Sequence, residues 1–321
     1  MKRKILFRAD ADQSIGFGHF VRTLALADML KEDFDCIFYT QTPTDYQRSE
    51  LSKVCNYVEL PSDDSKFERF WGLLKGDEIV FLDNYFFTPE YEKKIKEKGC
   101  RLVTISPNGR HHYADVLLNM GDDDLSKFDV EPYTRICRGI EWTILRPQFL
   151  KERSSVVRKK NCYVVCFGGT DQFRITEKVV EVLQRHTSTP EIHIIATSLV
   201  SEERVKLFNQ KNCCVHINVS ADEVAGIFDS CEAAVLSTST VAIEALSRGI
   251  VVYAGYYVDN QYKFCHYLTD KGYINGLGCL LDEDMPGRLF SFIRRGENRR
   301  GIIPAGLFAT KEKYVELFKS I

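Results

Sequence analysis

The stretch Ile15-Gly16-Phe17-Gly18-His19-Phe20-Val21-Arg22 decides how this chain folds. It follows a short apolar run, Ile5-Leu6-Phe7, and a polar turn, and it leads into a helical pattern of leucines and alanines. That order predicts a strand, a glycine-rich loop and a helix. Glycines at this place let the backbone approach a ligand closely, and the start of a helix offers free N–H groups to an anion. We therefore expect a phosphate-bearing substrate at this loop.

Gly16 and Gly18 do not form the dinucleotide-binding fingerprint, because no third glycine follows three residues later. A tight turn between strand and helix would explain the two glycines equally well. His19 favours a ligand-binding loop, since an imidazole at the helix start faces whatever the loop binds and can take up a proton near neutral pH. A histidine that only caps the helix or packs against a neighbour is the alternative.

The composition predicts a soluble globular chain with two domains. A chain of 321 residues is long enough for two domains with separate cores, and 44% of its residues are hydrophobic and 27% are charged. The net charge of -2 gives no reason to expect nucleic acid or an acidic membrane surface as a partner. No signal-peptide core follows the basic start Met1-Lys2-Arg3-Lys4, and no apolar stretch has the length of a membrane span. We predict a cytoplasmic protein without a membrane partner.

The eleven cysteines are scattered and odd in number, and Cys36, Cys162 and Cys166 lie within apolar runs. No Cys-x-x-Cys pair occurs. The pattern predicts reduced core residues, no metal site and no cofactor.

From residue 1 to 150, apolar runs alternate with helical patterns. The predicted strands cover residues 4–7, 36–39, 57–60, 79–82, 102–105 and 116–118, and the predicted helices lie near 20–31, 47–55, 66–75 and 89–98. This alternation indicates a parallel sheet with helices on both faces and a ligand at the carboxyl ends of its strands. Phe67, Phe70, Trp71 and Leu74 form one helical stripe, which we expect to pack on the sheet rather than touch a membrane.

Polar residues follow two of these strands at the carboxyl edge. Asp10 and Asp12 follow the first strand, and Asp83-Asn84-Tyr85 directly follows residues 79–82. Their side chains are expected to project towards the crevice that holds the glycine-rich loop. Turn formation and helix capping are the alternatives for such residues. A metal-binding role for Asp10 and Asp12 is set aside, because no further ligands accompany them.

A polar, basic segment at residues 151–160 is interpreted as a linker, so that one domain covers residues 1–150 and a second covers 151–321. In the second half, strands are predicted at 162–167, 192–196, 214–217, 233–236 and 251–254, with helices near 175–186, 201–210, 221–229, 240–248 and 260–270. A second parallel α/β domain is the natural interpretation. Helices near 286–295 and 310–320 end the chain, and we expect one of them to cross back onto the first domain.

Two loops of the second domain suit a nucleoside diphosphate. Gly168-Gly169-Thr170 follows a strand and offers unhindered N–H groups and a hydroxyl. Ser237-Thr238-Ser239-Thr240 starts a helix that carries Glu244, whose carboxylate suits the two hydroxyls of a ribose. Capping of the helix by serine and threonine explains the second motif about as well.

Taken together and in this order, the motifs resemble the UDP-sugar hydrolases of pseudaminic acid biosynthesis, which release UDP from UDP-2,4-diacetamido-2,4,6-trideoxy-β-L-altropyranose. The resemblance implies the GT-B fold of the lipid-II-forming N-acetylglucosaminyltransferase, an α/β fold in which two Rossmann-like parallel-sheet domains face a central cleft. The stretches that carry it are Arg8-x-Asp10, residues 15–19, Arg22-x-Leu24-x-Leu26-Ala27, Asp83-x-Tyr85, His112-x-x-Asp115-x-Leu117-Leu118-Asn119, Leu145-Arg146-x-x-Phe149, Gly168-Gly169-Thr170-Asp171, Ser237-x-Ser239, Glu244-Ala245-Leu246 and Asn260-Gln261.

The resemblance also implies roles for individual residues. His19 is the catalytic base, Glu244 binds the ribose, Tyr85 lies near the sugar, and Asn260 and Gln261 lie where sugar and nucleotide meet. The other residues expected to bind the sugar part of the substrate are Asp10, Gly16, Phe17, Gly18, Arg22, Asp83 and Arg146. Those expected at the nucleotide are Phe167, Gly168, Gly169, Thr170, Ser237, Ser239 and Thr240.

Three places depart from the family's pattern. Ser106-Pro107 stands where an acidic pair is usual, Asn84 where a histidine is common, and Trp142 where a tyrosine is expected. These positions surround the sugar pocket more than the nucleotide pocket. The departures leave UDP as the expected nucleotide and leave the identity of the sugar open.

The expected reaction is metal-independent, inverting hydrolysis of a UDP-linked diacetamido-trideoxy sugar, with His19 activating water and closure of the two domains excluding bulk water. A GT-B glycosyltransferase with an unknown acceptor and a non-catalytic nucleotide-sugar-binding protein are the alternatives. Release of UDP without an acceptor distinguishes the hydrolase from the transferase, and turnover distinguishes both from the binding protein. We expect a monomer or a weak homo-oligomer.

Overall fold

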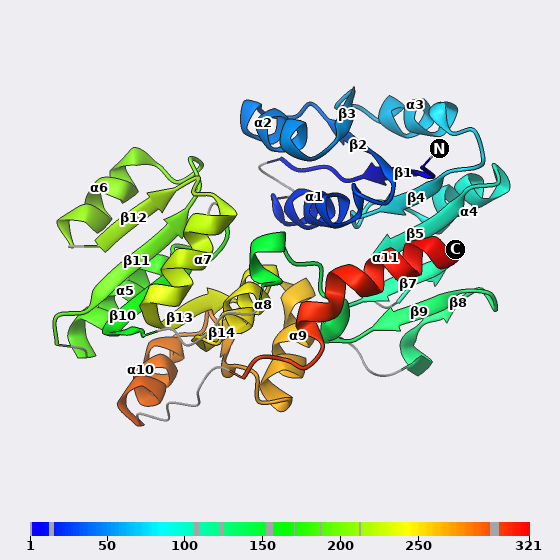
Figure 1. Cartoon of the computed structure of the whole chain (residues 1–321). Helices are drawn as coiled ribbons and strands as arrows, with labels where there is room; N and C mark the ends of the chain where they lie inside the picture. The colour runs from blue at the N-terminus through cyan, green and yellow to red at the C-terminus, as the bar shows by residue number, and fades with distance from the viewer. Residues whose placement is uncertain are drawn as a thin grey trace. The chain divides into compact units, whose positions relative to one another are not determined.

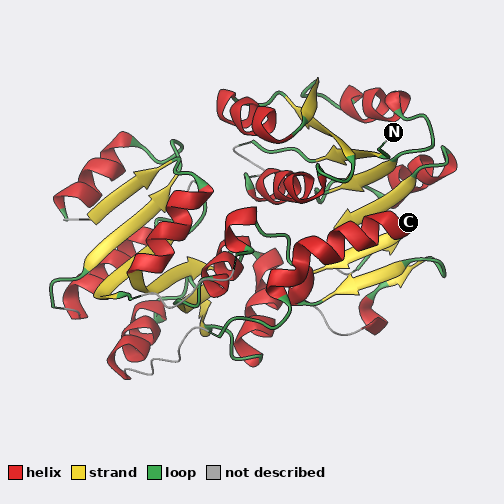
Figure 2. Ribbon diagram, in the orientation of Figure 1, coloured by secondary structure: helices red, strands yellow, loops and turns green. Residues whose placement is uncertain are grey.

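The computed structural model describes residues 2–12, 16–105, 109–121, 125–151, 157–169, 171–186, 188–211, 213–295 and 302–321. The chain divides into two compact units, one formed by Met1–Pro147 with Ala309–Ile321 and the other by Gln148–Phe308. Each unit contains a parallel sheet with helices on its faces (Figures 1 and 2). Among the described residues, no helix is both long enough and apolar enough to cross a bilayer.

The first unit has a seven-stranded parallel sheet in the order β3-β2-β1-β4-β5-β7-β9. The strands are β1 (Lys4–Arg8), β2 (Asp35–Gln41), β3 (Asn56–Leu60), β4 (Ile79–Leu82), β5 (Arg101–Ile105), β7 (Val116–Asn119) and β9 (Arg135–Arg138). The helices between them are α1 (Gly18–Leu30), α2 (Asp45–Val54), α3 (Ser65–Leu73) and α4 (Pro89–Glu97). The strand order reverses at β1 and β4, and such a switch point is where open α/β sheets bind their ligands.

Apolar side chains on both faces of this sheet explain why its strands read as continuous hydrophobic runs. Phe7 of β1 lies between Phe38 and Phe81 of the two neighbouring strands, at ring-centroid distances of 6.4 and 5.7 Å. The predicted stripe of the third helix packs on the sheet, with Phe70 fully buried. A short two-stranded ladder, β6 (His111–His112) with β8 (Asp129–Val130), was not predicted, because two residues are too few to show a pattern.

The last helix, α11 (Thr310–Ser320), packs against α1 within the first unit. Tyr314 is fully buried, its hydroxyl donates a hydrogen bond to the Trp142 carbonyl at 2.6 Å, and its ring packs edge-on against the Trp142 indole. Lys319 pairs with Asp33 at 2.5 Å beside the end of α1. The C-terminal residues therefore complete the core of a unit whose other part, Met1–Pro147, ends more than a hundred residues earlier in the chain.

Replacing Tyr314 by phenylalanine is expected to destabilise the first unit by about 1–3 kcal/mol, because the hydroxyl is lost from a fully buried side chain and the partly buried Trp142 carbonyl loses its donor. Both tryptophans of the chain, Trp71 and Trp142, lie in this unit, so urea unfolding followed by tryptophan fluorescence reports on it selectively. Tyr133→Phe is the matched control, since its hydroxyl makes the same kind of bond to the Tyr113 carbonyl from an exposed position. An equal loss of unfolding free energy in the two variants would contradict the conclusion that α11 completes the core of the first unit.

The second unit has a six-stranded parallel sheet in the order β12-β11-β10-β13-β14-β15. Its strands are β10 (Lys159–Cys166), β11 (Glu191–Ala196), β12 (Cys213–Ile217), β13 (Cys231–Ser237), β14 (Val251–Tyr256) and β15 (Asn275–Cys279). Its helices are α5 (Ile175–His186), α6 (Glu202–Gln210), α7 (Ala221–Ser230), α8 (Thr240–Ser247), α9 (Asp259–Asp270) and α10 (Met285–Arg295).

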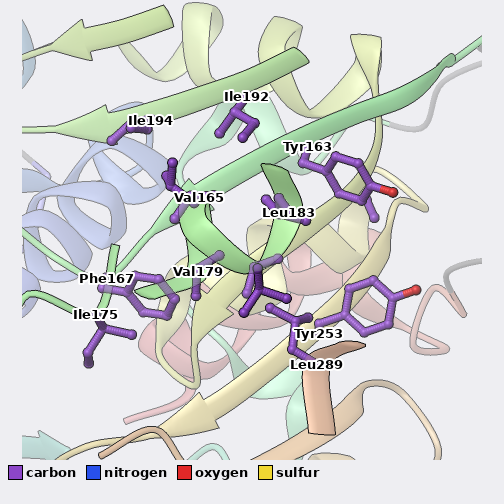
Figure 3. Close-up of a cluster of buried hydrophobic side chains, with 14 of the residues drawn as sticks. Tyr163, Val165, Phe167, Ile175, Val179, Leu183, Ile192, Ile194, Tyr253 and Leu289 are labelled. Carbon is purple, nitrogen blue, oxygen red and sulfur yellow. The ribbon is translucent and has the colours of Figure 1, made fainter. Parts of the chain in front are cut away.

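Figure 3 shows the main core of this unit, where Val165, Ile192 and Ile194 of the sheet meet Val179 and Leu183 of α5. Edge strand β15 was not predicted. Its sequence Asn-Gly-Leu-Gly-Cys is poor in strand-forming residues, and Gly278 has a positive φ of 67° beside a register shift.

Candidate functional site

The glycine-rich loop joins β1 to α1 in the first unit. Gly16 adopts a φ of +78°, a conformation that favours glycine, whereas Gly18 has no such φ and a Cβ there would meet no atom of the described residues within 4 Å. Phe17 at the N-cap position of α1 makes no side-chain capping bond, and the first turn of the helix carries no acidic residue. The fold itself thus gives a reason for Gly16 but none for Gly18, and the uncapped helix start is suited to an anion.

His19 sits in the first turn of α1 and is almost fully buried. Its Nδ1 lies 2.7 Å from Oδ1 of Asp83, the residue that directly follows β4. Because β1 and β4 are neighbours in the sheet, the loop after one strand and the carboxylate after the other meet at the switch point. The sequence predicted that these residues share one crevice, and the structure adds that they form a bonded pair.

Arg22, one turn further along α1, holds Asp83 from the other side. Its Nε donates to Oδ2 of Asp83 at 2.6 Å, its Nη2 donates to Oδ1, and the Thr23 hydroxyl adds a bond of 2.9 Å to Oδ2. Burial by itself would raise the pKa of Asp83, but the charge of Arg22 and the hydrogen bonds from Arg22 and His19 outweigh it and hold that pKa well below its usual range. Asp83 is therefore an ionised, fully buried carboxylate.

The ionised state of Asp83 determines the tautomer of His19. A carboxylate only accepts hydrogen bonds, so the 2.7 Å contact places a proton on Nδ1 of the imidazole. Nη2 of Arg22 also lies 3.0 Å from Nδ1 of His19. Because Nδ1 carries the proton that it donates to Asp83, it has no lone pair to accept a bond from Arg22. We therefore assign the hydrogen bond of Nη2 to the Asp83 carboxylate. Nε2 of His19 is then the atom with a lone pair for an incoming proton.

Aromatic side chains adjoin the pair. The half-exposed Tyr85 packs its ring edge-on against His19, with centroids 4.7 Å apart. The rings of Phe17 and Tyr46 of α2 pack edge-on, with centroids 6.3 Å apart. Burial raises the pKa of Tyr46, and the nearby positive charge of Arg146 acts against that rise, so Arg146 belongs to the same neighbourhood. Tyr46 was not predicted, because nothing in its helical surroundings marks it in the sequence.

Asp10 is placed differently from its predicted neighbours. It is fully buried, and its carboxylate is bound by both terminal nitrogens of Arg8, by the backbone N–H of Gln41 at 2.8 Å, and by Lys66 at 3.4 Å. Asn84 accepts from the Asp10 N–H at 2.7 Å and donates back to its carbonyl. These contacts tie the ends of β1, β2 and β4 together beneath the loop.

In the second unit, Phe167 and Gly168 follow β10 at the carboxyl edge. Gly168 has a φ of +83°, and a Cβ there would lie 3.2 Å from the Tyr257 hydroxyl, which itself donates to the Phe167 carbonyl. Gly169 accepts a bond of 2.7 Å from the hydroxyl of Thr197, at the end of the neighbouring strand β11. Thr170 lies outside the described residues.

The predicted serine-rich loop connects β13 to α8. Ser239 occupies the N-cap position of α8, but its side chain makes no capping bond, and its hydroxyl lies 3.5 Å from that of Ser237. Thr238 is turned inward and donates to the Gly255 carbonyl at 3.0 Å. The capping alternative therefore fails for this helix, and Thr240 opens a helix without a side-chain cap. Glu244, one turn further, is buried.

Helix α9 begins at the same edge after β14. Its start at Val258 is also without a side-chain cap, and Gln261 accepts a hydrogen bond from the Tyr257 backbone N–H at 3.2 Å. Asn260 lies in the first turn beside Gln261. Tyr257 thus links the Phe167–Gly168 loop of the second unit to α9, a role that one tyrosine after a strand could not reveal in the sequence.

Comparison with known proteins agrees with the resemblance seen in the motifs. The UDP-2,4-diacetamido-2,4,6-trideoxy-β-L-altropyranose hydrolase of Campylobacter jejuni is 27% identical over 285 residues, which cover 84% of this chain and 97% of that protein. The spore coat polysaccharide biosynthesis protein SpsG of Bacillus subtilis is 25% identical over 283 residues, 84% of this chain and 82% of SpsG. No protein-family model matches the chain.

Solved structures confirm the predicted α/β, two-domain GT-B fold. MurG of Acinetobacter baumannii superposes with a TM-score of 0.62 at 11% identity, over 99% of this chain and 100% of that one. Alr3699/HepE of Anabaena in complex with UDP superposes with a TM-score of 0.56 at 12% identity, over 99% and 98% of the two chains. At such low identity these likenesses concern the fold.

Proposed function

We propose that this protein hydrolyses a UDP-linked diacetamido-trideoxy sugar to UDP and free sugar, in the biosynthesis of a nonulosonic acid of the pseudaminic type. The observation that carries the proposal is the 2.7 Å pair of His19 and Asp83 at the start of α1, which leaves Nε2 of an imidazole as a base beside a glycine-rich loop. The Campylobacter hydrolase supports the choice of substrate through its similarity over most of both chains.

In the proposed reaction, water attacks the anomeric carbon from the face opposite UDP. The bond between that carbon and the diphosphate oxygen breaks, and UDP leaves with the bonding electrons, so the configuration inverts. Nε2 of His19 takes the proton from water, and the ionised Asp83 stabilises the imidazolium that forms. Phe17, Gly18, Tyr85 and Arg146 are proposed to surround the sugar.

The loops of the second unit are proposed to bind UDP. The uncapped starts of α8 and α9 and the hydroxyls of Ser237 and Ser239 suit the charge that develops on the leaving diphosphate. Gly168 and Gly169 are proposed to admit the nucleotide close to the backbone, and Glu244 to bind its ribose. Asn260 and Gln261 are proposed to contact the substrate from the first turn of α9.

Anomeric-proton NMR tests the proposal directly. The purified protein is mixed with UDP-2,4-diacetamido-2,4,6-trideoxy-β-L-altropyranose without added metal or acceptor, and the free sugar is followed in time. We expect conversion to UDP and free sugar of inverted configuration. Conversion only after an acceptor is added would replace the hydrolase by a glycosyltransferase. Binding of the UDP-sugar without turnover under either condition would leave a nucleotide-sugar-binding protein.

Replacing Gly18 by alanine is expected to reduce kcat/KM of this hydrolysis at least about tenfold, because the methyl group would occupy space used by the substrate. The fold has room for the methyl, and alanine favours a helix over glycine by up to about 1 kcal/mol, so stability should be unchanged or slightly higher. The measurement is steady-state kinetics together with thermal unfolding.

Gly72→Ala is the matched control for Gly18→Ala. Gly72 is likewise an exposed helical glycine of the first unit, and an alanine methyl there would also meet nothing within 4 Å, but it lies on α3, away from the loop. We expect it to keep full activity. Full activity in Gly18→Ala as well would mean that the substrate does not approach this residue.

A further inference from the structure

Three side chains with metal-binding atoms meet in the second unit, away from the nucleotide loops. The cluster consists of Cys162 of β10, Cys231 of β13 and His193 of β11. Their two sulfurs and one ring nitrogen of the histidine all lie within 4.8 Å of one another. The two sulfurs are 3.0 Å apart. The residues are remote in sequence and share no spacing motif, so the cluster could not be predicted from the sequence. We propose that Cys162, Cys231 and His193 bind a Zn²⁺ ion.

The local backbone explains how the two cysteines meet. The register between β10 and β13 shifts between Lys159 and Tyr163, and Asn161 in this irregular stretch has a φ of +56°. Cys231 is the first residue of β13, immediately after α7 ends. Irregularities of this kind often re-aim side chains in a sheet, and here the result is a buried pair of thiols.

The ligand chemistry suits Zn²⁺. Two thiolates and an imidazole form a soft donor set, which selects Zn²⁺ over the hard cations Mg²⁺ and Ca²⁺. Tetrahedral Zn–S bonds of about 2.3 Å require sulfurs about 3.8 Å apart, so the side chains need to separate by less than about one ångström.

Groups around the cluster hold the imidazole as metal-binding histidines are usually held. Nε2 of His193 lies 3.0 Å from Oε1 of Glu191, and that carboxylate also pairs with Lys159. Nδ1 of His193 lies 2.9 Å from Nε2 of His216 on β12. When one ring nitrogen binds the ion, the other therefore keeps a partner that fixes the ring. The partly exposed His193 side chain gives the ion a route from solvent.

Three protein ligands leave the fourth tetrahedral position to a water molecule, and the place of the cluster in the fold is one where the ion would link three strands. Cys231 opens β13, and Cys162 and His193 lie in the first half of their strands, whereas Gly168, Thr197 and Ser237 lie at the carboxyl ends of the same three strands. A bound ion would tie β10, β11 and β13 together at the end of the sheet opposite the nucleotide loops. The proposal does not depend on the hydrolase activity.

Cobalt substitution tests the site. The full chain, reduced and dialysed against EDTA, is titrated with Co²⁺ without oxygen and then with Zn²⁺. We expect one equivalent of Co²⁺ to give a sulfur-to-cobalt charge-transfer band and the intense visible bands of a tetrahedral ion, and Zn²⁺ to abolish both. Cys162→Ser, Cys231→Ser and His193→Gln should lose or weaken these bands, whereas Cys214→Ser, a nearby exposed thiol, should keep them.

Glu191→Gln provides a second measurement that does not remove a ligand. It is expected to weaken Co²⁺ binding about 10- to 100-fold while the protein stays folded, as judged by circular dichroism. Hydrogen exchange of the wild-type chain should slow in β10, β11 and β13 on addition of Zn²⁺. A chain that binds no stoichiometric Co²⁺, or that instead loses two hydrogens by forming a Cys162–Cys231 disulfide in air, would overturn the proposal.

Discussion

Replacing His19 by alanine is expected to lower kcat for the proposed hydrolysis of a UDP-sugar by about 10²–10⁴-fold, because the proposed reaction loses the general base that takes the proton from water. The substitution removes a ring whose Nδ1 is held by Asp83 at 2.7 Å and whose edge packs on Tyr85. KM should change less than kcat, since the proposed proton transfer occurs in the transition state and the loops proposed to bind UDP are unchanged. The measurement is the initial rate of UDP release.

His112→Ala is the matched control for His19→Ala. His112 is also a buried histidine of the first unit, paired through Nδ1 with a buried carboxylate, Glu92, at 2.9 Å. We expect it to lose stability but to keep the rate of UDP release, whereas His19→Ala should lose rate. Added imidazole should restore part of the activity of His19→Ala alone. A loss below about tenfold in His19→Ala would remove His19 from the role of base.

Much of this fold could be predicted because its strands are buried on both faces. Residues 79–82 of β4 are Ile-Val-Phe-Leu, a run whose limits coincide with the strand, and 251–254 lie within β14. Such runs are visible in a single sequence, as are the helices between them. Elements held mainly by their neighbours were missed, including the short β8 and the glycine-containing β15.

The sequence brings the candidate residues to one edge of the sheet but does not show which residue each of them binds. The position of Asp10 and Asp83 after adjacent strands predicted one crevice for both, and nothing in the sequence distinguishes them. In the structure, Asp10 pairs with Arg8 and Lys66, whereas Asp83 pairs with His19 and Arg22. The difference arises from which side chains of neighbouring strands and helices pack against each carboxylate, and that is a property of tertiary packing.

The remaining large effect is expected at Asp83. Asp83→Asn should lower kcat by about 10²–10⁴-fold although Asp83 itself takes no proton in the proposed reaction. An amide at this position can donate to Nδ1 of His19 and so favour the tautomer whose Nε2 carries the proton, and it no longer balances the imidazolium. Because Arg22 then loses its buried partner, stability should fall by about 3–5 kcal/mol.

Asp229→Asn separates the two effects of Asp83→Asn. Asp229 is a buried carboxylate of the second unit that holds Arg248 through two bonds of 2.9 and 2.8 Å, so its loss should cost comparable stability without displacing a base. We expect circular dichroism to show both variants destabilised and only Asp83→Asn to be slow at a temperature where both are folded. Equal rates would reduce Asp83 to a structural residue.

The pH dependence of stability provides an independent check on Asp83. Its pKa is held below the usual value in the folded chain, so its pairing stabilises the protein at every pH above the pKa of the unfolded carboxyl, about 4. The contribution is lost as the pH falls through the folded pKa. The difference in unfolding free energy between the wild type and Asp83→Asn should therefore stay constant from neutral pH down to about 4 and narrow only below it. A difference that narrows already between neutral pH and about 5 would mean that Asp83 is not the ionised partner that orients His19.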